Sequence, residues 1–579
     1  MTLSTNRRRF LQGTALLGGA GALAACGQKS SEEQADEAAE ENKKKADEAS
    51  ELPSTAWTRA EYDDVEDGGT LRLAVSQLPN NWNGSHADGA LVDRSTIVDP
   101  MSASGIRFTE EGEWELDPDY IVSAEVTSED PQIVTVQYNP DAVWETGDPI
   151  TIEDLIAYSK ALKGDDDAFQ VASTVGWEQV KEVRQTDDEF TGEIEFDSPY
   201  ADWITLVYPE FPHGISDDPE EFNKGYVDQN TPSNGPFKVD SIDNSGGVVT
   251  LTRNDKWWGR SPKLEKIIFS VVSQQQLPSA FANGELDALD GIADGDTYSQ
   301  ATARDDVDIQ KSNGVTWNWL GINLEGGNGI LADDKVREAI ARATNRDAVG
   351  AAVVGPLDSP VVLKDHFVFM PGQEGYEDSY EAAFGEPLTY DPEQAAKILD
   401  EAGWELGDGD VRMKDGDKLA LSFLIPADVK SNSDRARQIQ SDLNDVGFEV
   451  ELQTVPADAY FDEYVHVGNF DLITPGWQGT NFPETSSSNI YYPHSSAQNY
   501  TGINLDDEVA DDVNTMKSET DEAVRLEATN RFSKAVAETF STIPLYATPN
   551  IFAVKEGIVN YGASLFETFD WTQVGYAKE

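Results

Sequence analysis

The chain alternates between segments with strand periodicity and segments with helix periodicity. Residues 69–75 and 133–138 carry apolar side chains at every second position, which predicts two strands. Thr151 is followed by Asp154 three residues later, the spacing of a capping box. Leu155 and Tyr158 then begin an apolar helix face.

Further helices are predicted by their capping residues. Asp391 precedes Pro392, a preferred first helical residue, and an apolar stripe runs from Ala395 until Gly403 ends the helix. Asp333 or Asp334 is placed to cap another helix. These helices alternate with strands and show no internal repeat, so the sequence predicts an α/β protein.

The next region predicts a hairpin and then a helix that leads into a strand. Asp415-Gly416 is flanked by apolar residues and predicts a hairpin turn. A calcium loop that begins at Asp408 or at Asp415 is the alternative, but no glutamate stands at the twelfth position of either loop. Residues 436–446 repeat at helical spacing up to Gly447, and 448–452 then alternate with period two.

The N-terminus has the pattern of an export signal. Three arginines at 7–9 precede an apolar stretch from Ala15 to Ala25 that is too short to span a bilayer. Arg7 to Leu11 resembles a twin-arginine signal, and Leu23 to Cys26 resembles a bacterial lipobox, which implies lipidation of Cys26. The alternative for a lone cysteine is an inert buried thiol. Because the chain has one cysteine, we expect no disulfide and no cysteine metal site.

Residues following Cys26 have the composition of a tether. From about Ser30 to Glu51 they are mostly Glu, Lys, Ala, Asp and Ser, and we expect a disordered linker over 26–63. A short exposed helix is the alternative. Beyond it, the length of 579 residues and the 9% aromatic content predict two large lobes or three domains.

The net charge of −65 excludes electrostatic binding to nucleic acid or anionic lipid. The acids are spread along the chain, which favours a salt-adapted surface over a cation site. We therefore hypothesise a saline habitat, in which salt screens the self-repulsion.

Several motifs in order resemble the extracytoplasmic solute-binding proteins of family 5, which include dipeptide, oligopeptide and nickel binders. Residues 143–151 with Asp154 resemble the family signature W-x-D-G-x-P-L-T-x-x-D, although Thr146 stands where the signature has Asp. The other matching segments are 68–72, 232–237, 253–259, 281–287, Asn323, 336–346, 391–403 and 468–477. The 336–346 block has Asn345 in place of the family's Asp.

This resemblance implies two α/β lobes of the class II periplasmic binding fold, joined by a two-segment hinge that bends around the ligand. The expected organisation is signal 1–25, tether 26–63, lobe I from 64–98 with 230–312 and 548–579, an extra lobe I subdomain at 99–229, and lobe II at 313–547. The hinge crossings are expected near 312–315 and 546–549.

The resemblance also implies a ligand site between the lobes. Trp477 is the first candidate, because it lies beside Gly476 and Gly479 in a segment that contributes to the family's cleft. Many peptide binders have Asp three residues later, where this chain has Thr480 and then Asn481. Unless the register shifts and Glu484 takes that role, a neutral ligand becomes more plausible. The other candidates are Trp317, Asn318, Trp319, Asn81, Trp82 and Asn83. The alternative is that these asparagines form turns and the tryptophans are core.

The function expected from the resemblance is binding of an oligopeptide or similar solute for an ABC importer, with a permease and an ATPase as partners. We expect a monomer, held by lipid on the outer face of the cytoplasmic membrane, without cofactor, metal or catalytic residue. Residues 78–83 also resemble a mycobacterial envelope lipoprotein of the same fold linked to mannosylated phosphatidylinositol glycolipids. A regulator that binds a glycolipid or glycan is therefore the alternative. A glycoside hydrolase with two carboxylates is a further alternative, but no nucleophile, phosphate-loop or zinc motif is present.

Overall fold

The computed structural model describes residues 52–578, except residues 104, 228, 408, 428 and 458. The predicted export signal, Cys26 and the tether up to Glu51 lie outside the described residues. None of the helices described combines the length and the apolar character needed to cross a membrane.

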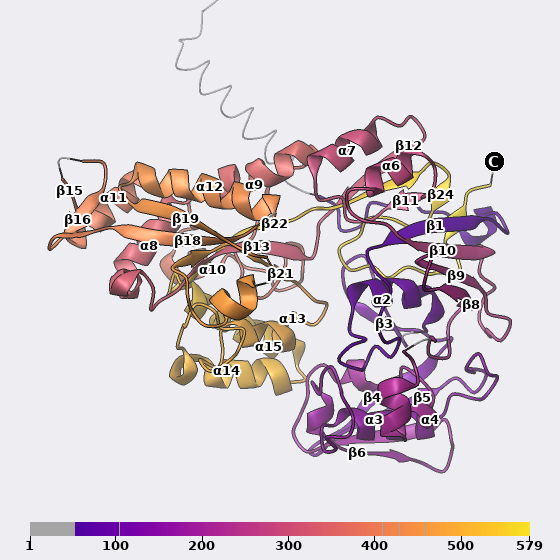
Figure 1. Cartoon of the computed structure of the whole chain (residues 1–579). Coiled ribbons are helices and arrows are strands. Elements are labelled where there is room, and N and C mark those ends of the chain that lie inside the picture. The colour runs from indigo at the N-terminus through magenta and orange to yellow at the C-terminus, as the bar shows by residue number, and fades with distance from the viewer. Residues whose placement is uncertain are drawn as a thin grey trace, which may run out of the picture. The chain divides into compact units, whose positions relative to one another are not determined.

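The first lobe is built on two sheets (Figure 1), and its buried apolar residues form two core clusters. The predicted strand 69–75 is confirmed as β1, whose side chains alternate between buried and accessible positions. It pairs in parallel with β10 in a sheet of order β1-β10-β9-β8. The strands are β1 (Thr70–Val75), β8 (Phe237–Asp243), β9 (Val248–Arg253) and β10 (Lys266–Val271). A second sheet has the order β11-β23-β12, with β11 (Ala288–Leu289), β12 (Val307–Ser312) and β23 (Asn550–Lys555). Helices α6 (Leu277–Ala282) and α7 (Gly295–Thr302) lie against it.

Inserted in this lobe is a subdomain with an antiparallel sheet of order β4-β5-β7-β6. The predicted capping box is confirmed: the Thr151 N–H donates to Asp154 Oδ2 at 2.9 Å at the start of α3. Gly192 of β7 allows Ile152 of α3 to pack closely, because a Cβ there would lie 2.7 Å from that side chain. The strands are β2 (Ile106–Phe108), β3 (Trp114–Leu116), β4 (Ile121–Glu129), β5 (Gln132–Tyr138), β6 (Val180–Gln185) and β7 (Thr191–Phe196). The helices within residues 99–229 are η2 (Asp99–Met101), α3 (Ile152–Leu162), η3 (Trp177–Gln179), η4 (Trp203–Leu206), α4 (His213–Ser216) and α5 (Pro219–Lys224), and α2 (Val92–Val98) precedes them.

The second lobe surrounds a seven-stranded sheet with its own core. Its path is β14-β22-β13-β20-β18-β19, and β21 pairs with β13. The strands are β13 (Thr316–Ile322), β14 (Val362–Leu363), β18 (Ala420–Pro426), β19 (Glu449–Val455), β20 (Leu472–Ile473), β21 (Gly476–Gln478) and β22 (Thr542–Ala547). The helices are α8 (Asp334–Ala343), α9 (Arg346–Val354), α10 (Ser379–Phe384), α11 (Pro392–Glu401), α12 (Lys430–Asp445), α13 (Pro483–Ser487), α14 (Asp506–Ser518) and α15 (Glu522–Ala537). Figure 1 shows α8, α9, α11 and α12 beside this sheet.

The caps and the turn predicted in this lobe are confirmed. Asp333 accepts from the Lys335 N–H, and Asp391 accepts from the Gln394 N–H. Asp415 and Gly416 both have positive φ, at 56° and 97°, as the turn between β16 (Arg412–Lys414) and β17 (Asp417–Lys418) requires. The predicted helix 436–446 is α12, which begins at Lys430 and thus earlier than its apolar stripe.

The chain crosses between the two sheet systems twice. β12 pairs with β23 in one lobe, whereas β13 pairs with β22 in the other. Both connections are short, from Ser312 to Thr316 and from Ala547 to Asn550. The sheets therefore form a two-lobed α/β fold. Short double connections of this kind allow hinge bending. The predicted residue boundaries of the lobes and subdomain stay predictions.

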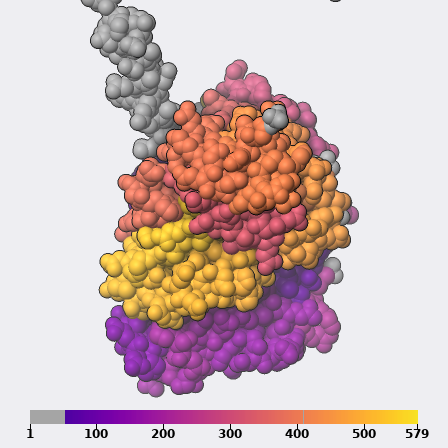
Figure 2. Space-filling model, turned by 90° about the vertical axis from the view of Figure 1, so that its left-hand side faces the viewer, coloured from indigo at the N-terminus to yellow at the C-terminus, as the bar shows by residue number. Residues whose placement is uncertain are grey.

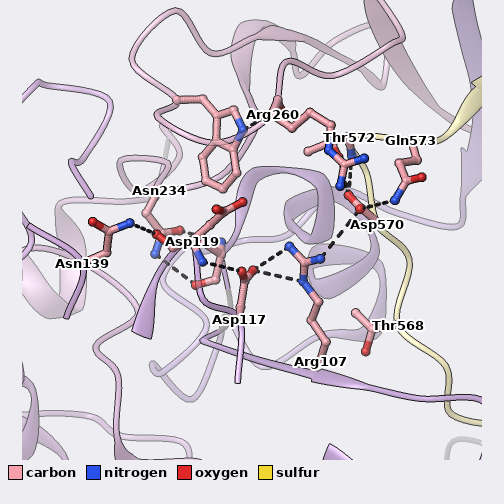
Figure 3. Close-up of polar contacts among 12 residues, drawn as sticks. Arg107, Asp117, Asp119, Asn139, Asn234, Arg260, Thr568, Asp570, Thr572 and Gln573 are labelled. Atoms are coloured by element: carbon pink, nitrogen blue, oxygen red, sulfur yellow. Dashed lines mark hydrogen bonds and ion pairs between the residues drawn. The ribbon is translucent and has the colours of Figure 1, made fainter. Parts of the chain in front are cut away.

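The C-terminal segment joins the subdomain to the rest of lobe I (Figure 3). Arg107 donates to Asp117 Oδ2 from Nε and Nη2, at 3.1 and 2.8 Å, and its Nη1 lies 3.7 Å from Asp570 Oδ2. Phe108 N–H donates to the Thr568 hydroxyl at 2.9 Å. The contacts of Arg107 with Asp570 and of Phe108 with Thr568 join residues more than 400 positions apart, so the C-terminal segment packs against β2.

Residues 52–63, which the sequence analysis assigned to the disordered tether, are instead part of lobe I. The Ala56 N–H donates to the Ala563 carbonyl at 2.9 Å. The Trp57 ring is 7% exposed and lies 5.1 Å from the ring of Phe569. The prediction was wrong here because Trp57 offers a large apolar surface to bury, which the polar stretch before it lacks.

Shorter elements complete the described fold. They are η1 (Tyr62–Asp64), η5 (Gly327–Ala332), η6 (Gly355–Leu357), β15 (Glu405–Leu406), η7 (Tyr460–Val465), η8 (Ser488–Ile490), β24 (Ile558–Val559) and β25 (Gly575–Tyr576).

Candidate ligand-binding site

A large cavity opens where the subdomain of lobe I meets lobe II. Its volume is about 740 Å³, and we call it the acidic cavity. Among the described residues that line it, seven are acids and Arg525 is the one basic residue. The charged lining residues are Glu110, Glu111, Glu113, Asp202, Glu374, Glu484, Glu522 and Arg525. Such a lining suits a cationic group of a ligand.

Contacts between the lobes close one side of this cavity. The Thr485 hydroxyl on α13 donates to the Asp202 carboxylate at the start of η4. The Ala201 N–H donates to the Lys517 carbonyl of α14 at 2.9 Å. Figure 2 shows the surface of residues near 500–540 lying against that of residues near 100–200. These contacts exist only while the lobes stay together.

Burial at the contact between the lobes raises the pKa of two acids, Asp202 and Glu484. Desolvation raises the pKa of Asp202, against a lowering effect of the Thr485 hydrogen bond and of Arg525. Desolvation also raises the pKa of Glu484, and the nearby Asp202 charge raises it further. The Arg525 Nε lies 3.8 Å from Glu484 Oε1. The contact between the lobes is therefore built from partly compensated charges that are shielded from water.

A second cavity, of about 450 Å³, lies at the two chain crossings, and we call it the hinge cavity. Lobe I contributes residues 291–293 and Asn550. The crossings contribute residues 314–315 and 548–549, and lobe II contributes Thr316, Asn318, Val353, Leu357, Ser431, Arg435, Gln478 and Tyr546. None of these described lining residues is Asp or Glu. The two cavities thus differ sharply in charge.

The predicted segment after β20 runs past both cavities. Gln478 lines the hinge cavity, whereas Asn481 lines the acidic cavity. Thr480, between them, is exposed and its hydroxyl lies 2.8 Å from the Ser486 hydroxyl. Glu484, considered only for a shifted register, lines the acidic cavity. The segment is therefore the one predicted element that connects the cavities.

Trp477 takes part in an aromatic stack rather than lining either cavity. Its ring lies 6.3 Å from Trp319 and 5.5 Å from Tyr500, nearly parallel to both. The indole N–H groups of Trp477 and Trp319 are buried, and neither has a hydrogen-bond partner within the described part of the chain. Trp317 pairs with Trp477 across β13 and β21 and is also buried. In this conformation Trp317 and Trp319 pack as core and Trp477 is half-buried against them, and a role in ligand binding stays a prediction.

Asn318 is the predicted lobe II residue that does reach a cavity. It faces the side of β13 opposite Trp317 and Trp319, because successive strand residues alternate. There it lines the hinge cavity and donates to the Thr548 hydroxyl at 2.8 Å.

The predicted lobe I candidates lie away from both cavities. The Asn81 amide N–H donates to the Asn223 carbonyl at 3.1 Å, and the Asn83 amide N–H donates to the Phe222 carbonyl at 2.9 Å. Both side chains also accept from backbone N–H groups two residues on. Trp82 is 1% exposed. This arrangement is the turn-forming and core role given above as the alternative.

Apart from Glu484, sequence reasoning missed the charged residues of both cavities. Asp202 and Arg525 lie in segments far from the family's motifs, so only the packing of the lobes reveals them. Arg435 carried a weak signal: it precedes Ile439 by four residues, on the buried face of α12. A basic residue on an apolar face marks a site or a buried ion pair. Among the described residues, no cluster of His, Cys, Asp or Glu could hold a metal ion.

Comparison with known proteins places this geometry in a family. The family model for bacterial extracellular solute-binding proteins, family 5, matches residues 115–500. The oligopeptide-binding protein OppA of Mycobacterium tuberculosis is 33% identical over 89% of this chain and 86% of its own length. The chain belongs to family 5. This confirms the expected family and fold, and these relatives are binding proteins rather than enzymes.

Two further relatives are informative. The probable monoacyl phosphatidylinositol tetramannoside-binding protein LpqW of Mycobacterium tuberculosis is 24% identical over 66% of this chain and 62% of its own length. The solved structure of the periplasmic EDTA-binding protein EppA is 26% identical, covers 91% of this chain and 99% of its own, and superposes with a TM-score of 0.81.

Proposed function

We propose that this chain is the substrate-binding subunit of an ABC importer and that it captures an oligopeptide between its lobes. The observation that carries the proposal is the pair of cavities at the lobe contact and hinge, one rich in acids and one with a lone buried arginine. A peptide carries an α-ammonium and a carboxylate. The likeness to OppA supports this ligand class.

Capture follows from lobe closure. The Asp202–Thr485 bond spans the lobes, and the hinge cavity is lined from both of them. A ligand that contacts both lobes shifts the population toward the closed form by the difference in its affinity for the two forms. Membrane permease domains would recognise that closed form, and a cytoplasmic ATPase would supply the energy.

The negative charge of the acidic cavity decides which group of a ligand the cavity can bind. Thr480 offers no charge to an ammonium, but Glu484 and Asp202 line the cavity next to it. Two carboxylates shielded from water bind an ammonium more strongly than an exposed hydroxyl does. We infer that these acids take the role that a single Asp has in many peptide binders.

The regulatory alternative concerns a different ligand class. LpqW is named for a phosphatidylinositol mannoside, whose phosphate is an anion. Seven acids around the larger cavity disfavour an anionic headgroup there. The peptide proposal is therefore favoured for this chain. We further propose a monomer that is exported and anchored through lipid on Cys26.

Native mass spectrometry of the purified chain, before and after denaturation, tests the proposal. We expect release of peptides, and calorimetric titration with tri- to penta-alanine should then give a measurable Kd. Replacing Glu484 by Gln should weaken peptide binding about tenfold or more, because one charge-assisted bond is lost. Replacing exposed Glu508 of α14 by Gln is the matched control. Release of a glycolipid, with no binding of any peptide, would refute the peptide assignment.

A further inference from the structure

Arg435 of α12 is a buried cation, and its hydrogen bonds within the described chain all go to neutral groups. The residue is 3% exposed. Its Nε donates to Thr474 Oγ1 at 3.1 Å and its Nη2 to the Thr474 carbonyl at 2.7 Å and to Asn432 Oδ1. Nη1 makes only a long 3.4 Å contact with the Tyr546 hydroxyl. In the part of the chain described, no carboxylate lies within ion-pair distance of this guanidinium.

Most other buried arginines of this protein have an acid beside them. Arg94 pairs with Glu210, Arg346 with Asp365 and Arg412 with Asp400. Pairing of this kind is the rule, because a buried charge without a counter-charge is costly. Arg337 also bonds only neutral groups, but these are three backbone carbonyls and it lines neither cavity. Arg435 is thus a buried cation that faces a cavity.

The hinge cavity around Arg435 favours an anion in other ways. Acids make up 107 of the 579 residues, yet none is among the described residues that line it. Thr316, Ser431 and Thr548 add hydroxyl donors. Ser431 lies in the first turn of α12, where no acidic side chain is present and Val429 provides no side-chain cap. The N–H groups of a helix's first turn carry a partial positive charge.

We propose that the hinge cavity binds an anionic group, with Arg435 as its counter-charge. The anion is either the carboxylate of the captured solute, in which case the inference rests on the proposed function, or a free inorganic or organic anion. The chemistry is the same in both cases. The guanidinium Nη1, the hydroxyls and the helix N-terminus suit a compact group of negatively charged oxygens.

Because the cavity is lined from both lobes and both crossings, occupancy should also favour one hinge angle. Residues 291–293 of lobe I and Ser431 and Arg435 of lobe II all line it. An anion that contacts both lobes would stabilise the closed form, in which both lobes line the cavity. Arg435 would then link ligand charge to lobe closure.

Calorimetric titration of the full chain tests the inference with three kinds of probe: tri-, tetra- and penta-alanine, the same peptides with C-terminal amides, and sodium acetate or phosphate. The variants are Arg435→Gln and Ser431→Asp. The second keeps Arg435 in place but supplies it with an internal carboxylate, at a helix start that tolerates an acid. Arg437→Gln on the exposed side of the same helix is the control, and melting curves show that each variant is folded.

If the solute carboxylate occupies the cavity, the free peptides bind the wild type about tenfold or more tightly than their amides. Arg435→Gln and Ser431→Asp remove that preference, and Arg437→Gln keeps it. If the source is a free anion, peptides and amides bind equally, and acetate or phosphate binds the wild type but not the two variants. The inference is overturned if the wild type binds peptides and their amides equally and binds neither acetate nor phosphate. It is also overturned if the preference for free peptides, or the binding of these anions, survives in both variants. If no peptide binds but anion binding depends on Arg435, the peptide function fails and the anion site stands.

Discussion

The hydrogen bond between Thr485 and Asp202 gives a direct test of how the lobes close. In the described structure, Thr485 is the side-chain donor to the Asp202 carboxylate, which is 4% exposed. Replacing Thr485 by Val keeps the shape but leaves that carboxylate without its donor. In the open form, water solvates Asp202 instead. The substitution therefore penalises closure rather than folding.

The size of the effect follows from the charge on the acceptor. A hydrogen bond to a charged group contributes about 1.5–3 kcal/mol, so its loss shifts the equilibrium between closed and open forms about 10- to 150-fold toward open. Solute affinity should weaken by up to the same factor, since only the closed form completes the site. The melting temperature should change little.

Small-angle scattering and calorimetry measure the two consequences together. We expect Thr485→Val to have a larger radius of gyration than the wild type at a given solute concentration, together with a weaker Kd. Thr515→Val is the control, because the Thr515 hydroxyl bonds the Asp511 carbonyl within α14. If Thr485→Val matches the wild type in both radius and Kd, this contact does not hold the lobes together.

Three other predictions follow from particular contacts. Burial in the closed form raises the pKa of Asp202 and Glu484, so closure takes up protons; without solute, closure followed by small-angle scattering should strengthen as pH falls from 7 toward the ordinary carboxyl range near 4, and a radius of gyration that instead rose over this range would contradict the assignment. Arg346→Met should lower the free energy of unfolding by about 3 kcal/mol or more in urea titrations, because it leaves Asp365 and several buried carbonyls without their donor. The control Arg437→Met should change the free energy of unfolding by less than about 0.5 kcal/mol. Gly235→Ala should destabilise the fold by about 1–3 kcal/mol, since its Cβ would lie 2.4 Å from the Met101 carbonyl carbon. The control Gly214→Ala, whose Cβ would meet nothing within 4 Å, should leave stability unchanged. Equal melting curves for the two variants would refute the packing argument.

The local elements of this protein could be predicted from its sequence. Thr151, Asp333 and Asp391 cap helices as expected, and Asp415-Gly416 forms the expected turn. These features depend on side chains bonding backbone groups two or three residues away, so a short stretch of sequence contains all the information. The order of the motifs was likewise enough to indicate the family and its fold.

The candidate site was predictable only in part. The sequence indicated the segment around Trp477 to Glu484, and the structure brings Gln478, Asn481 and Glu484 to the two cavities. It also indicated Asn81 and Asn83, whose amides proved to be bonded within lobe I. An asparagine that forms a turn and one that binds a ligand look the same in sequence, because both need only a polar side chain next to a strand end.

Tertiary structure alone decided the charge of the site. Asp202 and Thr485 are 283 positions apart, and Arg435 lines its cavity with residues from lobe I, lobe II and both crossings. In a chain with acids spread along its whole length, no local pattern tells an acid at a cavity from one in solvent, or an arginine with a partner from one without. That distinction depends on which groups the fold brings within a few ångströms and shields from water, because only there does a single charge control what binds.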